Sequence, residues 1–221
     1  MQTLSAVSPQ APPKRTSDRS LMRVIAGAAK GRTLAAPKGL AIRPTTDKVK
    51  GAVFSMLDAA AFRRADGAYS PTFPFSRVLD LYSGTGALGI EALSRGAGHC
   101  DFVESNPKAR ALIVENLRRT GFTSKATVHG IIAELAVSTF YVAYDLILAD
   151  PPYSDPAVLA LIDALGESQI VGEGSLVVVE HARSMEVPSR AGRLHLARSR
   201  YHGTSAIALY EAAPSLDRLA S

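Results

Sequence analysis

Short apolar runs alternate with stretches of helical periodicity over most of the 221-residue chain. Five runs are mostly apolar, as strands buried on both faces of a parallel sheet are, and they lie at 77–82, 100–104, 126–129, 144–149 and 175–180. Helical segments follow up to about 94, at about 107–119 and at about 156–166, with a short helix or apolar loop over 131–140. This alternation predicts an α/β fold built around a mostly parallel sheet.

The end of the chain has a different pattern. Residues 194–201 and 205–211 alternate apolar and polar positions. Such alternation is typical of antiparallel strands that expose one face, so a terminal antiparallel pair is expected on the same sheet.

The N-terminal part differs again. Residues 1–21 are rich in Ser, Pro and charge, and we expect a disordered tail there. From 22 to 44, short apolar pieces alternate with Gly, Pro and basic residues, which predicts a small β-hairpin. The chain is therefore divided into the tail, an N-terminal unit over 22–61 and a main domain over 62–221.

A helix is expected within the N-terminal unit, over about 47–61. Thr45 or Thr46 is a candidate N-cap for it. One face of the helix is apolar and is expected to pack on the main domain, which would leave Lys48 and Lys50 on the surface.

Charge is unevenly distributed along the chain. Residues 1–50 contain ten Lys and Arg and two Asp, a net charge of +8, so the other residues carry −3 of the total of +5. A basic arm on a mildly acidic body favours a polyanionic partner. The alternative is a solvated arm without a partner, although much of this arm lacks the composition of a disordered segment.

Composition excludes several classes of protein. One cysteine, Cys100, rules out an internal disulfide and a cysteine-based zinc cluster, and we expect it to be buried. The five histidines lack metal-ligand spacing, so no metal is expected. No apolar stretch approaches the ~20 residues that span a bilayer, and the N-terminus lacks the apolar region of a signal peptide. We expect a cytoplasmic, monomeric protein.

A glycine-rich loop follows the first buried run. Gly84, Gly86 and Gly89 match G-x-G-x-x-G, and Glu104 ends the next run about 20 residues further on. A carboxylate at Glu104 suits a ribose diol, the alternative being an ordinary surface carboxylate. Dinucleotides and S-adenosylmethionine both fit this arrangement. Asp80, just before the loop, would repel a pyrophosphate but suits the ammonium of a methionine group, which favours S-adenosylmethionine.

Asp150-Pro151-Pro152-Tyr153 follows the apolar run at 144–149. Two prolines cannot continue a strand, so the four residues are placed at the carboxyl edge of the sheet, where open α/β folds bind ligands. The Asp and a proline carbonyl can accept hydrogen bonds from a flat amine, and the Tyr ring can stack on it. The alternative is a turn that happens to contain these residues.

Together these motifs resemble those of class I S-adenosylmethionine-dependent amino-methyltransferases. More narrowly, the chain is similar to the bacterial 16S ribosomal RNA guanine-N2 methyltransferases of the RsmD family in four stretches: Arg23-Val-Ile-Ala-Gly, Gly31-Arg32-x-Leu34, Arg43-Pro-Thr-Thr-Asp-Lys-Val-Lys50 and Leu81-Tyr-Ser-Gly-Thr-Gly-Ala-Leu-Gly-Ile-Glu-Ala-Leu-Ser-Arg95-Gly-Ala. The resemblance covers about residues 22–212. The glycine loop and Asp-Pro-Pro-Tyr are widespread among methyltransferases, whereas the Arg-Pro-Thr-Thr-Asp stretch is more specific.

The resemblance implies a Rossmann-like, seven-stranded, mostly parallel sheet with a terminal antiparallel hairpin, and an N-terminal β-hairpin extension that meets RNA. Residues 62–221 would form the methyltransferase domain. Its reaction would be transfer of a methyl group from S-adenosylmethionine to N2 of one guanine in 16S rRNA, within the small ribosomal subunit, leaving S-adenosylhomocysteine.

The resemblance also assigns residues to roles. The cofactor would be held by Asp80, Tyr82, Ser83, Gly84, Gly86, Leu88, Glu104 and Ser105. The target base would be held by Asp150, Pro151, Pro152 and Tyr153. RNA would be contacted by Arg23, Lys30, Arg32, Lys38, Arg43, Thr45, Thr46 and Lys48.

One feature departs from the pattern. Methyltransferases often bind the adenine amino group through Asp or Asn after the third strand, whereas Ile131 and Ile132 follow His129-Gly130 here. Backbone and packing would then hold the adenine.

Three other functions stay open from the sequence. Asp-Pro-Pro-Tyr accepts any planar amine, so the substrate of an amino-methyltransferase could equally be DNA adenine, a different RNA or a protein glutamine. An NAD-dependent oxidoreductase shares the glycine loop, but Asp80 and the lack of a second catalytic domain weigh against it. A non-catalytic RNA-binding protein would not need both motifs intact.

Overall fold

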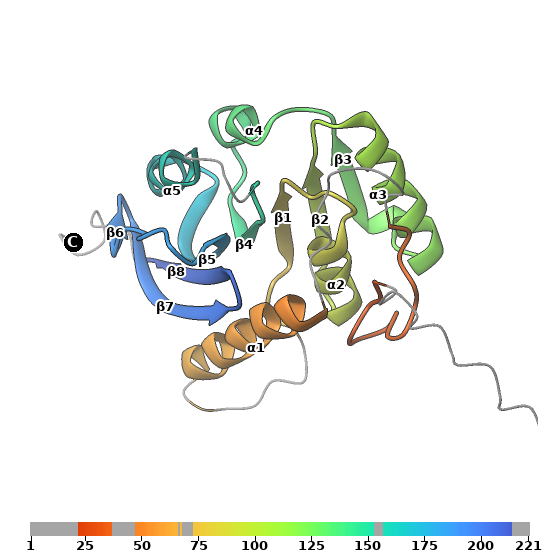
Figure 1. The fold of residues 1–221 in the computed structure, drawn as a ribbon, viewed down its shortest axis with the longest axis horizontal. Helices are drawn as coiled ribbons and strands as arrows, with labels where there is room; N and C mark the ends of the chain where they lie inside the picture. The colour runs from red at the N-terminus through yellow and green to blue at the C-terminus, as the bar shows by residue number, and fades with distance from the viewer. Residues whose placement is uncertain (1–21, 37–46, 66, 68–72, 153–156, 214–221) are drawn as a thin grey trace, which may run out of the picture.

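The computed structural model describes residues 22–36, 47–65, 67, 73–152 and 157–213. They form one eight-stranded sheet with the strand order β3-β2-β1-β4-β5-β8-β7-β6 (Figure 1). The strands are β1 (Arg77–Leu81), β2 (His99–Val103), β3 (Ala126–His129), β4 (Tyr144–Ala149), β5 (Val171–Ala182), β6 (Arg190–Ala191), β7 (Leu194–His202) and β8 (Ser205–Ala212). The helices are α1 (Asp47–Arg64), α2 (Ala87–Arg95), α3 (Pro107–Thr120), α4 (Ala133–Thr139) and α5 (Ala157–Glu167), with a 3₁₀ turn at Thr123–Lys125.

The predicted fold class is confirmed. Strands β1 to β5 pair in parallel, and β8, β7 and β6 are added in antiparallel fashion. All seven expected strands are present. The eighth, β6, has only two residues, which is too short to leave a pattern in the sequence.

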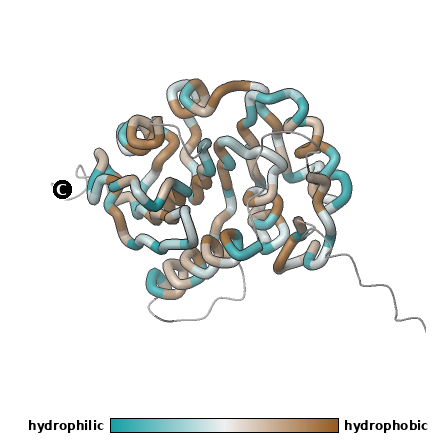
Figure 2. Tube along the Cα trace, in the orientation of Figure 1, coloured by the Kyte–Doolittle hydropathy of each residue, from teal (hydrophilic) through white to brown (hydrophobic). Residues whose placement is uncertain are grey.

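The sheet is covered on both faces. Side chains such as Leu148 and Val178 pack with α1, α2 and α3, whereas their neighbours Ile147 and Val177 pack with α4 and α5. Successive side chains of a strand point to opposite faces, so both faces of β4 and β5 are apolar. Helix α3 alternates hydrophobic and hydrophilic residues along its length, as a helix with one buried face does (Figure 2).

Residues 22–36 form a short hairpin beside α2 and α3 (Figure 1). Arg23 and Thr33 make an antiparallel bridge. The amide of Leu34 donates to the Met22 carbonyl at 2.8 Å, and the amide of Val24 to the Arg32 carbonyl at 3.0 Å. The predicted hairpin is thus present, with a single β-bridge between its two sides. Residues 1–21, the expected tail, lie outside the described residues.

Three buried polar side chains attach this hairpin to the main domain. Glu91 on α2 accepts hydrogen bonds from the amides of Ile25 and Ala26 at 2.8 and 3.0 Å. Ser94 on α2 accepts from the Ala29 amide at 2.9 Å and donates to the Ala26 carbonyl. Asn116 on α3 accepts from the Ala35 amide at 2.6 Å and donates to the carbonyls of Ala35 and Thr85 at 3.2 and 2.9 Å. The hairpin therefore belongs to the same packed body as the sheet.

Helix α1 ends at Arg64, three residues beyond the expected end, and it corrects one prediction. Lys48 is exposed, as expected, but Lys50 is fully buried. The Lys50 ammonium donates to the Arg23 carbonyl and lies 3.3 Å from Asp47 Oδ1. Burial lowers the pKa of Lys50, while the charges of Asp47 and Glu91 act in the opposite direction. The expectation of a surface Lys50 was wrong because the hairpin covers it.

Candidate active site

The glycine loop connects β1 to α2 at the carboxyl edge of the sheet. Its backbone has positive φ angles at Tyr82 (54°), Gly84 (55°) and Gly86 (78°). Glycine adopts this conformation readily, but a tyrosine must be held in it by its surroundings. The Tyr82 hydroxyl donates to Glu134 Oε1 on α4 at 2.6 Å. This bond ties the loop to α4.

Gly86 and Gly89 allow α2 to pack closely on β2. A Cβ atom on Gly89 would lie 2.4 Å from the Phe102 ring and 2.7 Å from the Sγ atom of Cys100, which is buried as expected. A Cβ atom on Gly86 would lie 3.3 Å from the same ring. The two glycines therefore bring the start of α2 close to the strand. Leu88 is buried in the first turn of this helix.

Ser83 is buried beneath the loop. Its hydroxyl donates to the carbonyls of Asp80 and Val103 at 2.5 and 3.2 Å, and its amide donates to the Val103 carbonyl at 3.1 Å. These bonds join the loop to β1 and β2. The described role of Ser83 is thus to support the loop, and its contact with a cofactor stays a prediction.

Asp80 lies at the centre of the site. Its side chain is 1% exposed, and its Oδ2 atom accepts a hydrogen bond from the Gly89 amide at 2.9 Å. Burial raises the pKa of Asp80 to about 8; the Gly89 bond acts against this rise, and the negative charges of Asp150 and Glu104 add to it. The three carboxyl groups therefore share one electrostatic environment. A cation bound beside Asp80 would stabilise its charged form.

Glu104 follows the end of β2 and is held by two backbone amides. The Gly84 amide donates to Oε2 at 2.9 Å, and the Asn106 amide donates to Oε1 at 2.8 Å. A carboxylate oxygen can accept more than one hydrogen bond, so both oxygens keep acceptor capacity. The carboxylate is thus fixed in one orientation at the edge of the sheet, as an acceptor for a diol must be.

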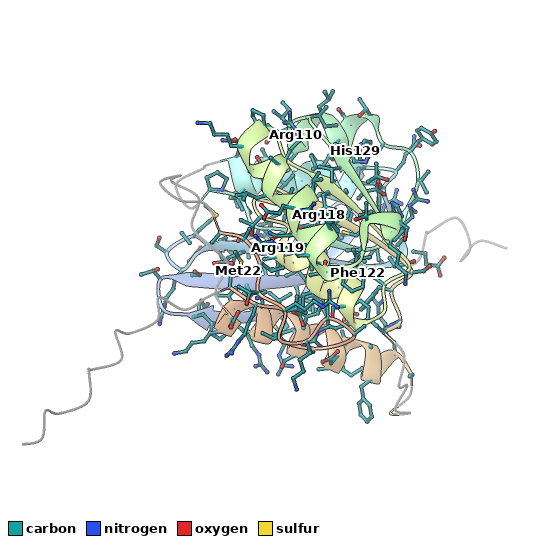
Figure 3. The ribbon with its side chains drawn as sticks, turned by 90° about the vertical axis from the view of Figure 1, so that its right-hand side faces the viewer. Met22, Arg110, Arg118, Arg119, Phe122 and His129 are labelled. Atoms are coloured by element: carbon teal, nitrogen blue, oxygen red, sulfur yellow. The ribbon has the colours of Figure 1, made fainter. Side chains whose placement is uncertain are left out.

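Arg110 borders the site beyond Glu104. Its guanidinium donates to the carbonyls of Ser105 and Glu104 at 2.6 and 3.2 Å. It also covers Gly130, where a Cβ atom would lie 3.0 Å from Arg110 Cζ. Figure 3 shows Arg110 and His129 at the same end of α3. Arg110 was not among the predicted site residues, although its position one turn after the N-cap of α3 places it near the end of β2. Ser105 itself is exposed.

Asp150 lies between the ends of two other strands. Ala149, the residue before it, pairs with Leu81 of β1 on one side and with Val179 of β5 on the other. Asp150 is half-buried, Pro151 is buried and Pro152 is exposed. The structure thus brings Asp150 to Asp80, two positions that lie 70 residues apart in the sequence. Tyr153 lies outside the described residues, so its stacking role stays a prediction.

The predicted RNA-binding residues that the structure describes are all exposed, and they are Arg23, Lys30, Arg32 and Lys48. Arg23 forms an ion pair with Asp47 at 3.2 Å. Arg32 donates to the Arg119 carbonyl at 2.6 Å, so the hairpin meets the end of α3. The other predicted residues, Lys38, Arg43, Thr45 and Thr46, lie outside the described part of the chain.

Helix α3 extends the basic surface beyond the hairpin. Arg118 and Arg119 are exposed near its end, close to Met22 of the hairpin in Figure 3. Arg119 pairs with Glu115 one turn earlier. The sequence analysis confined the basic surface to residues 1–50 because nothing in the charge pattern showed that α3 packs beside the hairpin.

The chain was compared with known proteins. The family model described as Conserved hypothetical protein 95 matches residues 22–211. The chain belongs to this family. YlbH of Bacillus subtilis (strain 168), provisionally named an rRNA methyltransferase, is 38% identical over 193 residues, which are 86% of this chain and 98% of YlbH. Ribosomal RNA small subunit methyltransferase D of Escherichia coli (strain K12) is 27% identical over 86% of this chain and 89% of its own length.

Solved structures of related proteins are also similar to this chain. The Escherichia coli protein YhhF, provisionally named a methyltransferase, superposes with a TM-score of 0.74 at 25% identity, over 88% of this chain and 99% of YhhF. An RNA methyltransferase of Salinibacter ruber in complex with S-adenosylhomocysteine has a TM-score of 0.55 at 16% identity, over 79% of this chain and 96% of its own, and shows the shared fold. The predicted RsmD-type family and class I fold are confirmed.

The described segments lack two further kinds of feature. Their helices include none that is long and apolar enough to cross a membrane. Among their side chains, no group of three or more His, Cys, Asp and Glu is arranged to hold a metal ion.

Proposed function

We propose that this chain transfers a methyl group from S-adenosylmethionine to the exocyclic N2 of a guanine in the RNA of the small ribosomal subunit. The observation that carries the proposal is the convergence of Asp80, Glu104 and Asp150 at one sheet edge, beside the glycine loop. The relatives named small-subunit rRNA methyltransferases support the choice of RNA. The guanine N2 target rests on the motifs that resemble the RsmD family.

The donors and acceptors of the site fit S-adenosylmethionine, the cofactor of this methyltransferase family. Asp80 offers a buried carboxyl group to a cation, and Glu104 offers two oriented oxygens to the ribose hydroxyls. Gly84 and Gly86 keep side chains away from the ligand. Arg110 and Gly130 bound the adenine side, where the family's usual Asp or Asn is missing. When bound, the cofactor supplies an electrophilic methyl group.

The residues at the end of β4 would activate the amine. The exocyclic amine of guanine is a poor nucleophile because its lone pair is delocalised into the ring. Hydrogen bonds from its two N–H groups to Asp150 and to the Pro151 carbonyl would direct the lone pair out of the ring plane. Alignment of this kind lowers barriers by up to roughly 7–11 kcal/mol. Asp150 would also accept the proton that the amine loses after transfer.

The hairpin and α3 would position the RNA. Contacts from Lys30, Arg32 and Arg118 to phosphates give affinity and orientation without reading sequence. Met22 of the hairpin lies beside the glycine loop, with its Sδ atom 3.6 Å from Thr85 Oγ1, and the Asp150 side of the sheet edge would receive the target base.

A transfer assay with tritiated S-adenosylmethionine tests the proposal. Small-subunit particles, naked 16S RNA, DNA and protein extract are offered separately, and labelled RNA is digested to nucleosides. Label in N2-methylguanosine from the particle is the expected result. Label confined to DNA adenine or to protein glutamine would overturn the substrate, and absence of both label and cofactor binding would overturn the enzymatic function.

A further inference from the structure

A second basic stretch lies near the end of the chain. Residues 183–202 contain five Arg and one Glu, a net charge of +4, although residues 51–221 together carry −3. Three of these arginines, Arg183, Arg198 and Arg200, are exposed, and so is Tyr201. These four residues are called the β7 patch below. The ion pairs within the described residues include no arginine of the patch, so its positive charge is not neutralised there.

Strand pairing places the patch level with Asp150. One row of paired residues crosses four strands and consists of Ala149 of β4, Val179 of β5, Ala208 of β8 and Ser199 of β7. Because β8 is antiparallel to both β5 and β7, β7 runs in the same direction as β4. Asp150 and Arg200 each follow this row by one residue, so they are level. Three strand spacings separate them, about 14 Å in all, which a few nucleotides span.

Tyr201 lies one residue further toward the carboxyl edge of the sheet, where Arg183 stacks on it. Its side chain is 62% exposed, and Arg183 Cζ lies 5.2 Å from the centroid of its ring. Arg183 directly follows the end of β5, so the two side chains meet at the edge that carries the candidate active site. An exposed ring beside a guanidinium is the kind of surface on which RNA-binding proteins stack unpaired bases.

Protection of the sheet edge alone does not explain this composition. The edge strand β6 pairs with only the first two residues of β7. Charged side chains prevent such a strand from pairing with other sheets, but lysine or an acidic residue would serve equally well. The patch combines arginine with an aromatic ring instead. Arginine donates two parallel hydrogen bonds to a phosphate and stacks on rings, which favours a nucleic acid as the partner.

The arginines at the opposite end of β7 have a different role. Arg190 donates to the Gly192 carbonyl at 3.3 Å, and Arg193 donates to the Val171 carbonyl at 3.0 Å. Both therefore bind the protein's own backbone. The exposed arginines whose side chains make no such bond within the described residues are those nearer the active-site edge.

The patch and the hairpin lie on opposite sides of the site for the target base. The hairpin is attached to α2 and α3, beside β1 and β2, whereas β7 lies on the other side of β4 (Figure 1). An RNA strand that contacts both would cross the end of β4, where Asp150 is placed.

We propose that the β7 patch is a second RNA-binding surface, which holds single-stranded nucleotides next to the target guanine. Arg198 and Arg200 bind phosphates, and Tyr201 stacks on an unpaired base. Successive side chains of a strand point to opposite faces, so the RNA backbone passes on the Arg200 side and a base turns toward Tyr201 across the end of β7. This surface rests on the proposed function, because it requires RNA as the substrate.

Filter binding to naked 16S RNA over a salt series tests both kinds of contact. Arg200→Ala should weaken binding and lower the slope of log K against log salt by about 0.7, the value for one phosphate of a single strand. Tyr201→Leu should weaken binding roughly five- to a hundred-fold and leave the slope unchanged, because it removes stacking and no charge. Tyr201→Phe keeps the ring and should bind like wild type. Arg190→Ala, at the opposite end of β7, is the matched control and should change neither quantity.

Two further measurements complete the test. Calorimetry with S-adenosylhomocysteine should find wild-type affinity in every variant, which reports a folded cofactor site. Wild-type affinity and slope for RNA in both Arg200→Ala and Tyr201→Leu would overturn the role of the patch, even where wild-type protein methylates the RNA. Weaker binding to small-subunit particles, with unchanged binding to naked 16S RNA, would overturn RNA as the partner and indicate a ribosomal protein. If wild-type protein transfers no methyl group to RNA, the proposed function itself fails.

Discussion

The amide of Gly89 donates a 2.9 Å hydrogen bond to the buried carboxyl group of Asp80. The same glycine packs so closely on β2 that a Cβ atom would lie 2.4 Å from the Phe102 ring. The close approach of α2 to the sheet is therefore what brings this amide to Asp80. A backbone donor favours the charged carboxylate, while burial and two neighbouring carboxyl groups oppose it, and the outcome is a pKa of about 8. The packing of α2 on β2 and the charge of the cofactor site are thus linked through Gly89.

Cofactor binding should depend on pH through Asp80. Below pH 8 the carboxyl group is mostly protonated in the free protein, whereas a cationic ligand prefers the charged form. Apparent affinity should therefore rise about tenfold per pH unit as pH increases toward 8, and then level off. Calorimetry on both sides of that pH measures this. Asp80→Asn should bind weakly and with little pH dependence; a flat profile for wild-type protein would contradict the role of Asp80.

The stability of the cofactor-free protein should depend on the same group. The pKa of Asp80 is about 8 when folded, against an ordinary value of 3.8, so the folded state binds more protons between these two pKa values. The stability contributed by the protonated carboxyl is fully present below the lower value and is lost as pH rises through the higher one. Asp80→Asn keeps an oxygen acceptor for Gly89 and cannot ionise. Urea unfolding should therefore find that the stability of Asp80→Asn relative to wild type grows as pH rises from about 4 to about 8, and a difference that stays constant over this range would disprove the shift.

Asp150→Ala should separate catalysis from cofactor binding. Asp150 belongs to the end of β4, while the groups that fit the cofactor lie on β1 and β2. Calorimetry should find cofactor binding retained, and the tritium assay should find methyl transfer abolished. Loss of cofactor binding would mean that Asp150 is part of the cofactor site. Asp163→Ala, which removes an exposed aspartate on α5 outside the site, is the matched control and should leave transfer unchanged.

The basic residues of the hairpin should set the salt dependence of RNA binding. Each phosphate contact that is removed lowers the slope of log K against log salt by about one. Lys30→Ala and Arg32→Ala should each weaken RNA binding and flatten that slope in filter-binding measurements over a salt series. Arg190→Ala, an equally exposed arginine on the edge strand β6, should leave the slope unchanged. Unchanged slopes for both hairpin variants would show that the RNA phosphates contact other parts of the protein.

The features that could be predicted from sequence depend on local patterns. Asp80, Glu104 and Asp150 each lie near the end of an apolar run, and parallel strands bring such ends to one edge, so their convergence follows from the runs alone. Glu91 and Asn116 are different. They occupy ordinary helical positions, and only the packed structure shows that they bind the amides of Ile25, Ala26 and Ala35. Contacts between segments far apart in sequence leave no periodic signal.

Lys50 illustrates the same limit. Helical periodicity placed Lys50 on a surface, but the hairpin that buries it comes from outside that helix.

Glu91→Gln should loosen the hairpin from the sheet domain. The buried carboxylate accepts hydrogen bonds from two hairpin amides and from Arg95 Nε, the last at 3.0 Å. A carboxamide has one acceptor oxygen, so at least one buried amide loses its partner, at a cost of roughly 1–3 kcal/mol in the free energy of unfolding. Urea unfolding measures this loss. Glu115→Gln, in a partly exposed ion pair on α3, should change stability little.

Hydrogen exchange at the amides of Ile25 and Ala26 should accelerate in Glu91→Gln and not in Glu115→Gln. RNA binding by Glu91→Gln should weaken, while its cofactor binding persists. Protection of these two amides equal to wild type would show that the hairpin is held by its apolar contacts and not by Glu91.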